Sequence, residues 1–408
     1  MERVAPVDQW SPRPGAGGRA FGIEVNRAQL PGLLIGAVSL LVMVLAVVGS
    51  AHLWATWSGT FEQVEPAAAG SQSLAVVGNV AYLSGTVSFL GPATAPAQLG
   101  ALNLGARRVT GTIPTTTVPS GVAASPDGRW LYVADTDVGA PAGELGIVDL
   151  TTQRAVAWIR VGSGPTGVDV SPDGRFVYVA DTGYLGRGSV SIVDVAGRSV
   201  VGTVQVGQNP VGLAISPDGT HLYVADSAVA AEIPGAPAPA GPPGVSVVDT
   251  GTRTVVATVA IGGPGTIGPG PFQLCLSPDG SRLYVADPGS HNLSVVDTST
   301  DQVVGSVTLP ASPFDVVASA DGRRLYVDDG AVTLLAAAPS SAHQVFVVDT
   351  GTLTATGAVD VGQDPAGMAL ANSGTQLVVA DEFDPGVTVV DTSTLEPTAL
   401  TPPGWKPA

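Results

Sequence analysis

The chain has 408 residues, a formal net charge of −17 at pH 7 and a single cysteine. Proteins that hold a phosphate backbone need a stripe of Lys and Arg, and the sequence shows none, so nucleic acid is excluded as a partner. The one cysteine, Cys275, has no intramolecular partner, which excludes a disulfide framework.

The N-terminal region predicts a membrane anchor. Residues 1–29 are rich in Pro, Gly and Arg without an apolar period, as in a flexible tail. Residues 30–51 contain no charged side chain and are long enough to cross a bilayer as a helix. Four arginines precede this run and the next basic residue is Arg107, so the tail is expected in the cytoplasm and the rest outside the cell membrane.

A cleaved secretory signal is the alternative for the same segment. Gly49, Ser50 and Ala51 have the small side chains of a cleavage site, but the apolar run exceeds the length of an ordinary signal core. We therefore expect a retained single-pass helix at 30–51, followed by a stalk at 52–71.

A repeat dominates the remaining sequence. Its best copy, from Ser171 to Asp194, starts with the turn Ser-Pro-Asp-Gly, continues with a strand that ends at Asp181, and reaches a further strand after a loop. Six such copies and a worn one before them give seven units, each with four strands over roughly 40 to 50 residues, which is the pattern of propeller blades. The sequence thus predicts an all-β seven-bladed β-propeller of four-stranded antiparallel blades at 72–400, with a C-terminal tail at 401–408.

The repeat unit resembles that of the YVTN-type β-propeller family of bacterial and archaeal surface or periplasmic proteins. The resemblance rests on Pro-x-Gly-Val-x-Val-Ser-Pro-Asp-Gly, then Tyr-Val-Ala-Asp and Ser-Ile-Val-Asp, in residues 165–194. It implies the propeller fold. It implies no particular activity, because the matching residues belong to turns and core strands.

Motifs of catalysis are absent from the sequence, which favours a protein that is not an enzyme. Two histidines, His291 and His343, each stand six residues before the Asp that ends a third strand, so neighbouring blades present them at matching places. Two matching imidazoles could hold a metal, although exposed loop histidines are commoner, and the metal content stays open.

Acidic residues recur at the ends of the second strands, as at Asp135, Asp181 and Asp226. A rim of carboxylates could attract Ca²⁺, but a side-chain cap on the turn that each Asp begins explains the period without a ligand. Three acids outside this series are expected to face solvent: Asp328, Glu382 and Asp384.

The inner strands carry small residues because seven of them converge on the axis. Asp169, Gln273 and Asp315 break this pattern and are candidates for lining a water-filled channel or binding a small ligand at its mouth. Water in the channel satisfying these groups is the alternative.

Loop lengths give the functional expectation. Connections from second to third strands and from fourth to first strands vary in length and emerge on one face of a propeller, where binding is usually placed. We expect a membrane-anchored scaffold that binds a protein or a cell-envelope polysaccharide through this face, without a cofactor. The alternative is a propeller enzyme, lactonase-like or dependent on a metal or redox cofactor, with its site at the loop face or channel mouth.

Overall fold

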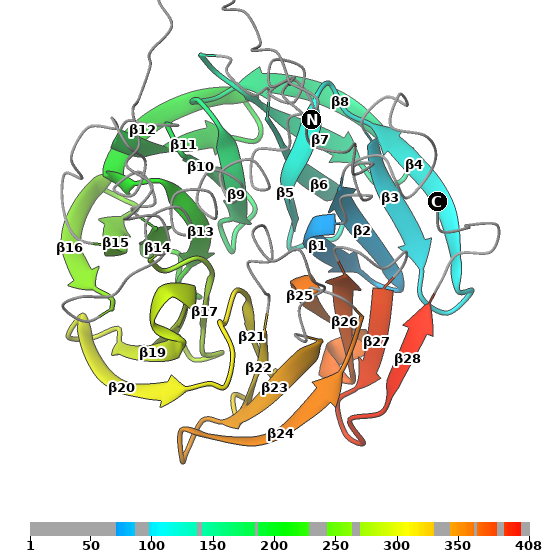
Figure 1. Ribbon diagram of the computed structural model, residues 1–408. Coiled ribbons are helices and arrows are strands. Elements are labelled where there is room, and N and C mark those ends of the chain that lie inside the picture. Colours follow the sequence, from blue (N-terminus) through cyan, green and yellow to red (C-terminus); the bar gives the residue numbers. More distant parts are fainter. Residues whose placement is uncertain are drawn as a thin grey trace, which may run out of the picture.

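The computed structural model describes residues 71–85, 98–136, 141–183, 187–227, 243–262, 270–329, 343–362, 365–381 and 387–400. These residues form seven four-stranded antiparallel sheets arranged as a ring (Figure 1). The predicted seven-bladed propeller is confirmed. In the described ranges no helix is long and apolar enough to cross a membrane, and the expected anchor at 30–51 lies outside them.

The blades follow one another in chain order. The first four consist of β1 (Ser71–Val77), β2 (Val80–Gly85), β3 (Gln98–Asn103), β4 (Arg108–Pro114); β5 (Val118–Ala124), β6 (Trp130–Thr136), β7 (Glu144–Asp149), β8 (Arg154–Arg160); β9 (Pro165–Val170), β10 (Phe176–Asp181), β11 (Arg187–Asp194), β12 (Ser199–Gln208); β13 (Pro210–Ile215), β14 (His221–Asp226), β15 (Gly244–Asp249) and β16 (Thr254–Ala260).

The last three blades repeat the same order, with a 3₁₀ turn in two of them. They consist of β17 (Leu274–Leu276), β18 (Arg282–Asp287), η4 (Pro288–Ser290), β19 (Asn292–Asp297), β20 (Gln302–Thr308); β21 (Val316–Ala318), β22 (Arg324–Asp328), β23 (Gln344–Asp349), β24 (Thr354–Asp360); β25 (Pro365–Ala371), η6 (Asn372–Gly374), β26 (Gln376–Asp381), β27 (Val387–Asp391) and β28 (Pro397–Leu400).

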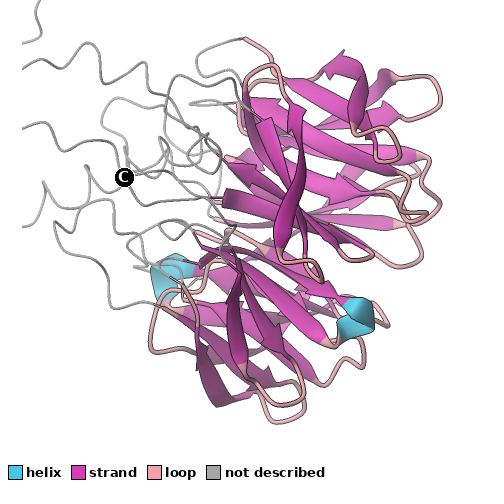
Figure 2. Ribbon diagram, turned by 90° about the vertical axis from the view of Figure 1, so that its right-hand side faces the viewer, coloured by secondary structure: helices cyan, strands magenta, loops and turns pink. Residues whose placement is uncertain are grey.

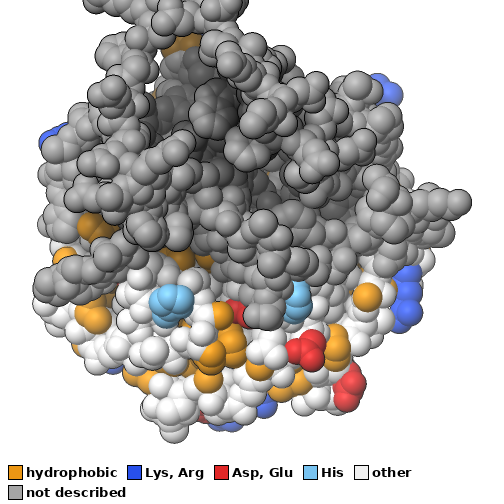
Figure 3. All heavy atoms as spheres, in the orientation of Figure 1, with side chains coloured by type: hydrophobic (Ala, Val, Ile, Leu, Met, Phe, Trp, Pro, Cys, Tyr) orange, Lys and Arg blue, Asp and Glu red, His pale blue; other side chains and the backbone are white. Residues whose placement is uncertain are grey.

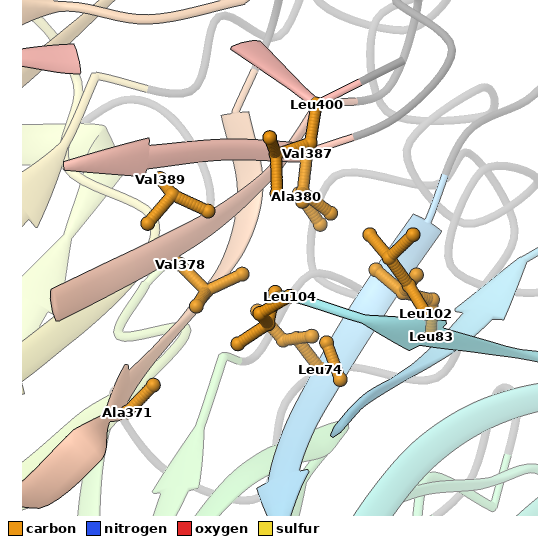
Figure 4. Close-up of a cluster of buried hydrophobic side chains, with 11 residues drawn as sticks. Leu74, Leu83, Leu102, Leu104, Ala371, Val378, Ala380, Val387, Val389 and Leu400 are labelled. Carbon is orange, nitrogen blue, oxygen red and sulfur yellow. The ribbon is translucent and has the colours of Figure 1, made fainter. Parts of the chain in front are cut away.

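Apolar cores lie between neighbouring blades, since each sheet can bury its faces only against the next one. The seam where the ring closes is of this kind. Leu74, Leu83 and Leu102 of the first blade pack against Val378 and Val387 of the seventh (Figure 4). Each of these two blades takes all four strands from one end of the propeller sequence, so side-chain packing closes the ring and no sheet combines strands from both ends.

The repeated turn has the chemistry that its residues predict. The Ser171 hydroxyl donates to Asp173 Oδ1 at 2.6 Å, and the Arg175 N–H donates to the same oxygen at 3.0 Å. These bonds, led by the one from Ser171, lower the pKa of Asp173. Gly174 has φ of 70°, in the left-handed region that L side chains rarely adopt.

Replacing Gly174 by Val is therefore expected to destabilise the protein by about 1 to 2 kcal/mol. The nearest atom to an added Cβ is Pro126 Cδ at 3.8 Å, so the loss comes from backbone strain and not from a clash. Gly251→Ala is the matched control, because Gly251 lies in another exposed turn without a positive φ. Equal thermal midpoints for both variants would contradict the strain argument.

The ring has two different faces. On the turn face lie the connections from first to second and from third to fourth strands; on the loop face lie the connections from second to third and from fourth to first strands. Figure 2 shows the described turns of the turn face as short loops along one side of the ring. All strand ends that flank the variable connections lie on the other side, as expected from the sequence.

Candidate functional site

Of the aspartates that end the second strands, those in blades two to four are buried and bind groups outside the turn that follows them. Asp287 in blade five does bind that turn, since its Oδ2 accepts the Ser290 hydroxyl at 2.6 Å. Asp135 Oδ2 accepts N–H bonds from Thr116 at 2.7 Å and Thr117 at 2.9 Å, which belong to the connection entering the blade. Asp181 Oδ2 accepts the Ser191 hydroxyl at 2.7 Å, and Asp226 Oδ2 accepts the Ser246 hydroxyl at 2.5 Å. In blades two to four the partners are thus the incoming connection and the third strand, which corrects the expected cap in these blades.

Blades five and six depart from the repeat near the axis. Their inner strands, β17 and β21, have three residues, whereas the inner strands of the other blades have six or seven. The segments just before them carry Phe272 and Gln273 in blade five and Phe314 and Asp315 in blade six. The rings of Phe272 and Phe314 meet edge to face, with centroids 5.2 Å apart. We call Phe272, Gln273, His291, Phe314, Asp315 and Asp328 the blade 5–6 sector.

Gln273 and Asp315 occupy the position that is glycine in blades two, three, four and seven. At this position the inner strands approach closely: a Cβ on Gly121 would lie 1.8 Å from the Thr166 carbonyl oxygen, and one on Gly167 2.2 Å from that of Val211. Larger side chains fit in blades five and six only because the regular strands there begin after this position. The sector is therefore a local change of backbone path as well as of sequence.

Asp315 and Asp169 join neighbouring blades. Asp315 Oδ2 accepts the Met368 N–H at 2.8 Å, and Asp169 Oδ2 accepts the Ile215 N–H at 2.8 Å, so each reaches the inner strand of the next blade. Desolvation raises the pKa of each carboxyl to about 6, against the lowering effect of these backbone bonds. Asp169 lies in blade three, two positions further along its inner strand, and so stands apart from Gln273 and Asp315.

Asp328 was expected to face solvent and is instead fully buried. It occupies the place of a buried alanine in the second strands of other blades, such as Ala134 and Ala180. Its Oδ1 accepts the N–H groups of Phe314 at 3.0 Å and Asp315 at 2.6 Å. Alignment of its strand with Tyr-Val-Ala-Asp in the other copies is the signal that could have revealed this burial. Glu382 and Asp384 lie outside the described residues.

The two candidate histidines begin the third-strand regions of these same blades, on the loop face. His291 is exposed, and its Nδ1 lies 3.3 Å from the Ser312 hydroxyl. His343 is half-buried, and its Nδ1 has no hydrogen-bond partner. Figure 3 shows two histidine side chains over the lower half of this face, where β17 to β28 lie in Figure 1, with apolar side chains nearby.

Four of the five residues selected from the sequence therefore belong to two adjacent blades. Among the described residues no group of three or more His, Cys, Asp or Glu side chains is placed to hold a metal ion. Cys275 packs against the core between blades five and six, and burial raises the pKa of its thiol, so a thiolate ligand is not at hand.

The fold and site define a propeller with a modified sector in blades five and six, and known proteins resemble parts of this chain. The model of the cytochrome D1 heme domain, a β-propeller family, matches residues 114–186, which fall in blades two and three. A 41-residue segment is 42% identical to hydrazine synthase subunit beta of Kuenenia stuttgartiensis, covering 10% of this chain and 11% of that protein.

The solved structure of Kuenenia stuttgartiensis hydrazine synthase contains a similar chain, with a TM-score of 0.66 and 19% identity. The match covers 83% of this chain and 99% of that one. At this identity the likeness shows the shared fold.

The match to the cytochrome D1 heme domain corrects the expectation that no cofactor is bound, because the group named for that family is haem. The blade 5–6 sector fits such a group. If His291 donates its Nδ1 proton to Ser312, its Nε2 keeps a lone pair for iron, and the hydrogen bond orients the ring. The Phe272 and Phe314 rings offer apolar surface for a macrocycle. A bound haem would supply one-electron chemistry.

Proposed function

We propose that the protein is an extracytoplasmic redox propeller that binds haem on the loop face, at the blade 5–6 sector, with His291 as an iron ligand. The observation that carries this proposal is the combined departure of blades five and six from the repeat beside an imidazole that Ser312 orients. The haem-domain match and the hydrazine synthase likeness support the chemical class.

The cellular setting and the finer family belong to the same proposal. The charge-free run at 30–51 would anchor the chain as a single-pass helix, with the propeller outside the membrane. The repeat unit supports membership of the YVTN-type propellers within the broader fold.

A second function has its own supporting observation. The variable connections share the loop face, so a protein or cell-envelope polysaccharide could bind there to a cofactor-free scaffold. The two functions differ in what the purified protein contains.

The test is an absorption spectrum and an iron assay of the full chain purified from cells supplied with haem. We expect stoichiometric haem, and His291→Ala is expected to lose or shift the Soret band because iron loses its imidazole. His221→Ala is the matched control, since His221 lies on the turn face, where its Nδ1 contacts Thr220. Wild-type protein with neither haem nor iron would end the redox proposal in favour of the scaffold.

A further inference from the structure

The buried carboxyl group of Asp328 has no role in the repeat. The same position is alanine in five other blades, namely Ala134, Ala180, Ala225, Ala286 and Ala380. Alanine needs no polar partner there, whereas a carboxyl group must be desolvated. The fold is therefore complete without Asp328, and its presence in one blade calls for another explanation.

Asp328 fixes a short backbone segment at the loop-face end of the inner strand. Its Oδ1 receives the N–H groups of Phe314 and Asp315, and its own N–H donates to the Asp315 carbonyl at 3.2 Å. This segment begins at Ser312, whose hydroxyl contacts His291, and includes the Phe314 ring that packs on Phe272. The Asp328 side chain thus fixes the backbone at Phe314 and Asp315, next to the Ser312–His291 contact and the Phe314–Phe272 contact.

The other oxygen of this carboxyl group, Oδ2, is buried without a hydrogen-bond partner. The ionisable groups that act on Asp328 are two further acids, Asp315 from the inner-strand segment and Asp329 from its own strand. Desolvation, followed by the charge of Asp315, raises the pKa of Asp328 well above its ordinary value and outweighs the lowering effect of the N–H bonds from Asp315 and Phe314. Ionisation would leave a buried charge beside other acids and an oxygen that only water could satisfy.

We propose that Asp328 is a pH-responsive positioning residue: in its neutral form it holds the segment from Ser312 to Asp315 in place, and ionisation releases that segment. Release frees Phe314 from its two-ring contact and removes the support of His291. As far as it concerns haem, the proposal rests on the function proposed above; the movement of the segment does not.

Hydrogen exchange of the full-length protein, measured by mass spectrometry without cofactor, tests the movement. In wild type the protection factor of the segment 312–318 is expected to fall as the pH rises, by up to about tenfold per pH unit once Asp328 ionises. The segment 118–124 serves as the internal reference, because the equivalent place in its blade is Ala134. Its protection factor should change less with pH than that of 312–318.

Two variants separate position from charge. Asp328→Asn keeps an oxygen that can accept the two N–H groups but cannot ionise. Above about pH 7, where Asp315 with its pKa of about 6 is already ionised, protection at 312–318 in this variant should stay high relative to the reference segment and change little with pH. Asp328→Ala, which copies the other blades and should fold, leaves both N–H groups unbonded, so protection should be low at every pH. Wild-type pH dependence in Asp328→Asn, or wild-type protection in Asp328→Ala, would overturn the proposal.

The haem spectrum supplies a separate readout. If the protein binds haem, alkaline pH should alter the His291-dependent Soret band in wild type and leave it unchanged in Asp328→Asn. Protein without haem would end the proposed function, while the exchange experiment would still decide the role of Asp328. A Soret band with the same pH dependence in both proteins would overturn the link between Asp328 and His291.

Discussion

Raising the pH from about 5 to about 8 is expected to destabilise the propeller by about 3 kcal/mol for each of two buried carboxyl groups, Asp181 and Asp226. Both side chains are almost inaccessible, and each leaves Oδ1 without a hydrogen-bond partner. Burial raises the pKa of each to about 7, although serine hydroxyls lower it in part. The ordinary value, 3.8, applies to the unfolded chain.

The sign follows from the proton count. Between pH 3.8 and about 7 the folded protein holds protons that the unfolded chain has lost, so stability is full at low pH and falls as the pH rises through 7. The turn-face aspartates act in the opposite direction. Hydrogen bonds led by those from Ser216 and Ser277 lower the pKa of Asp218 and Asp279 to about 2, so their contribution is lost below about pH 4. Maximum stability is therefore expected at mildly acidic pH.

Urea unfolding across this pH range provides the measurement. The double variant Asp181→Asn, Asp226→Asn should show a decline between pH 5 and 8 that is smaller by about 3 kcal/mol for each carboxyl group removed, because amides do not ionise. The remaining decline belongs to the other buried acids, Asp169, Asp315 and Asp328. Asp173→Asn is the control, since that turn-face carboxyl is exposed and its pKa is lowered. A double variant with the wild-type slope would show that other groups cause the decline.

The repeat allowed the fold to be predicted because the residues that set it are local. In blades two to six the turn between the first two strands is closed by its own serine and aspartate. The second strand that follows is a short continuous run of apolar residues, so both features can be recognised from the local sequence alone. The first copy lacks the Ser-Pro-Asp-Gly turn but keeps its glycine: Gly78 lies in the turn between β1 and β2 with φ of 58°.

The partners of buried acids could not be predicted in this way because they lie in other parts of the ring. Asp135 bonds to the connection that enters its blade, and Asp315 bonds to the inner strand of the next blade. The prediction of a solvent-facing Asp328 is wrong because Asp329 takes the aspartate position at the strand end. Asp328 therefore replaces the core alanine of the other repeats and is not an additional surface acid.

The turns between third and fourth strands show a further limit. In all seven blades a residue other than glycine takes a positive φ there: Arg107, Gln153, Arg198, Arg253, Asp301, Leu353 and Leu395. Sequence alone predicts Gly or Asn at such a place. The side chains explain the exception, because some of them extend over the blade before: Arg253 donates to the Val201 carbonyl, and Leu353 covers Gly305. These side chains therefore contribute contacts between neighbouring blades.

Gly121→Ala is expected to have the largest effect of any single methyl group in the ring, about 3 kcal/mol or more. The added Cβ would lie 1.8 Å from the Thr166 carbonyl oxygen, far inside contact distance, and that atom belongs to the backbone of the next inner strand. A backbone carbonyl group cannot avoid the clash by changing rotamer as a side chain can, so the inner strands of blades two and three must move apart.

Gly100→Ala makes the matched control, because Gly100 is also in a strand and nothing lies within 4 Å of an added Cβ. There the alanine should be neutral or stabilising, since it restricts the unfolded chain. Denaturation midpoints of both variants at one pH give the comparison. If Gly121→Ala unfolded at the wild-type midpoint, the close approach of neighbouring inner strands would not explain the glycines at this position. The larger residues Gln273 and Asp315 would then no longer indicate a change of backbone path in blades five and six.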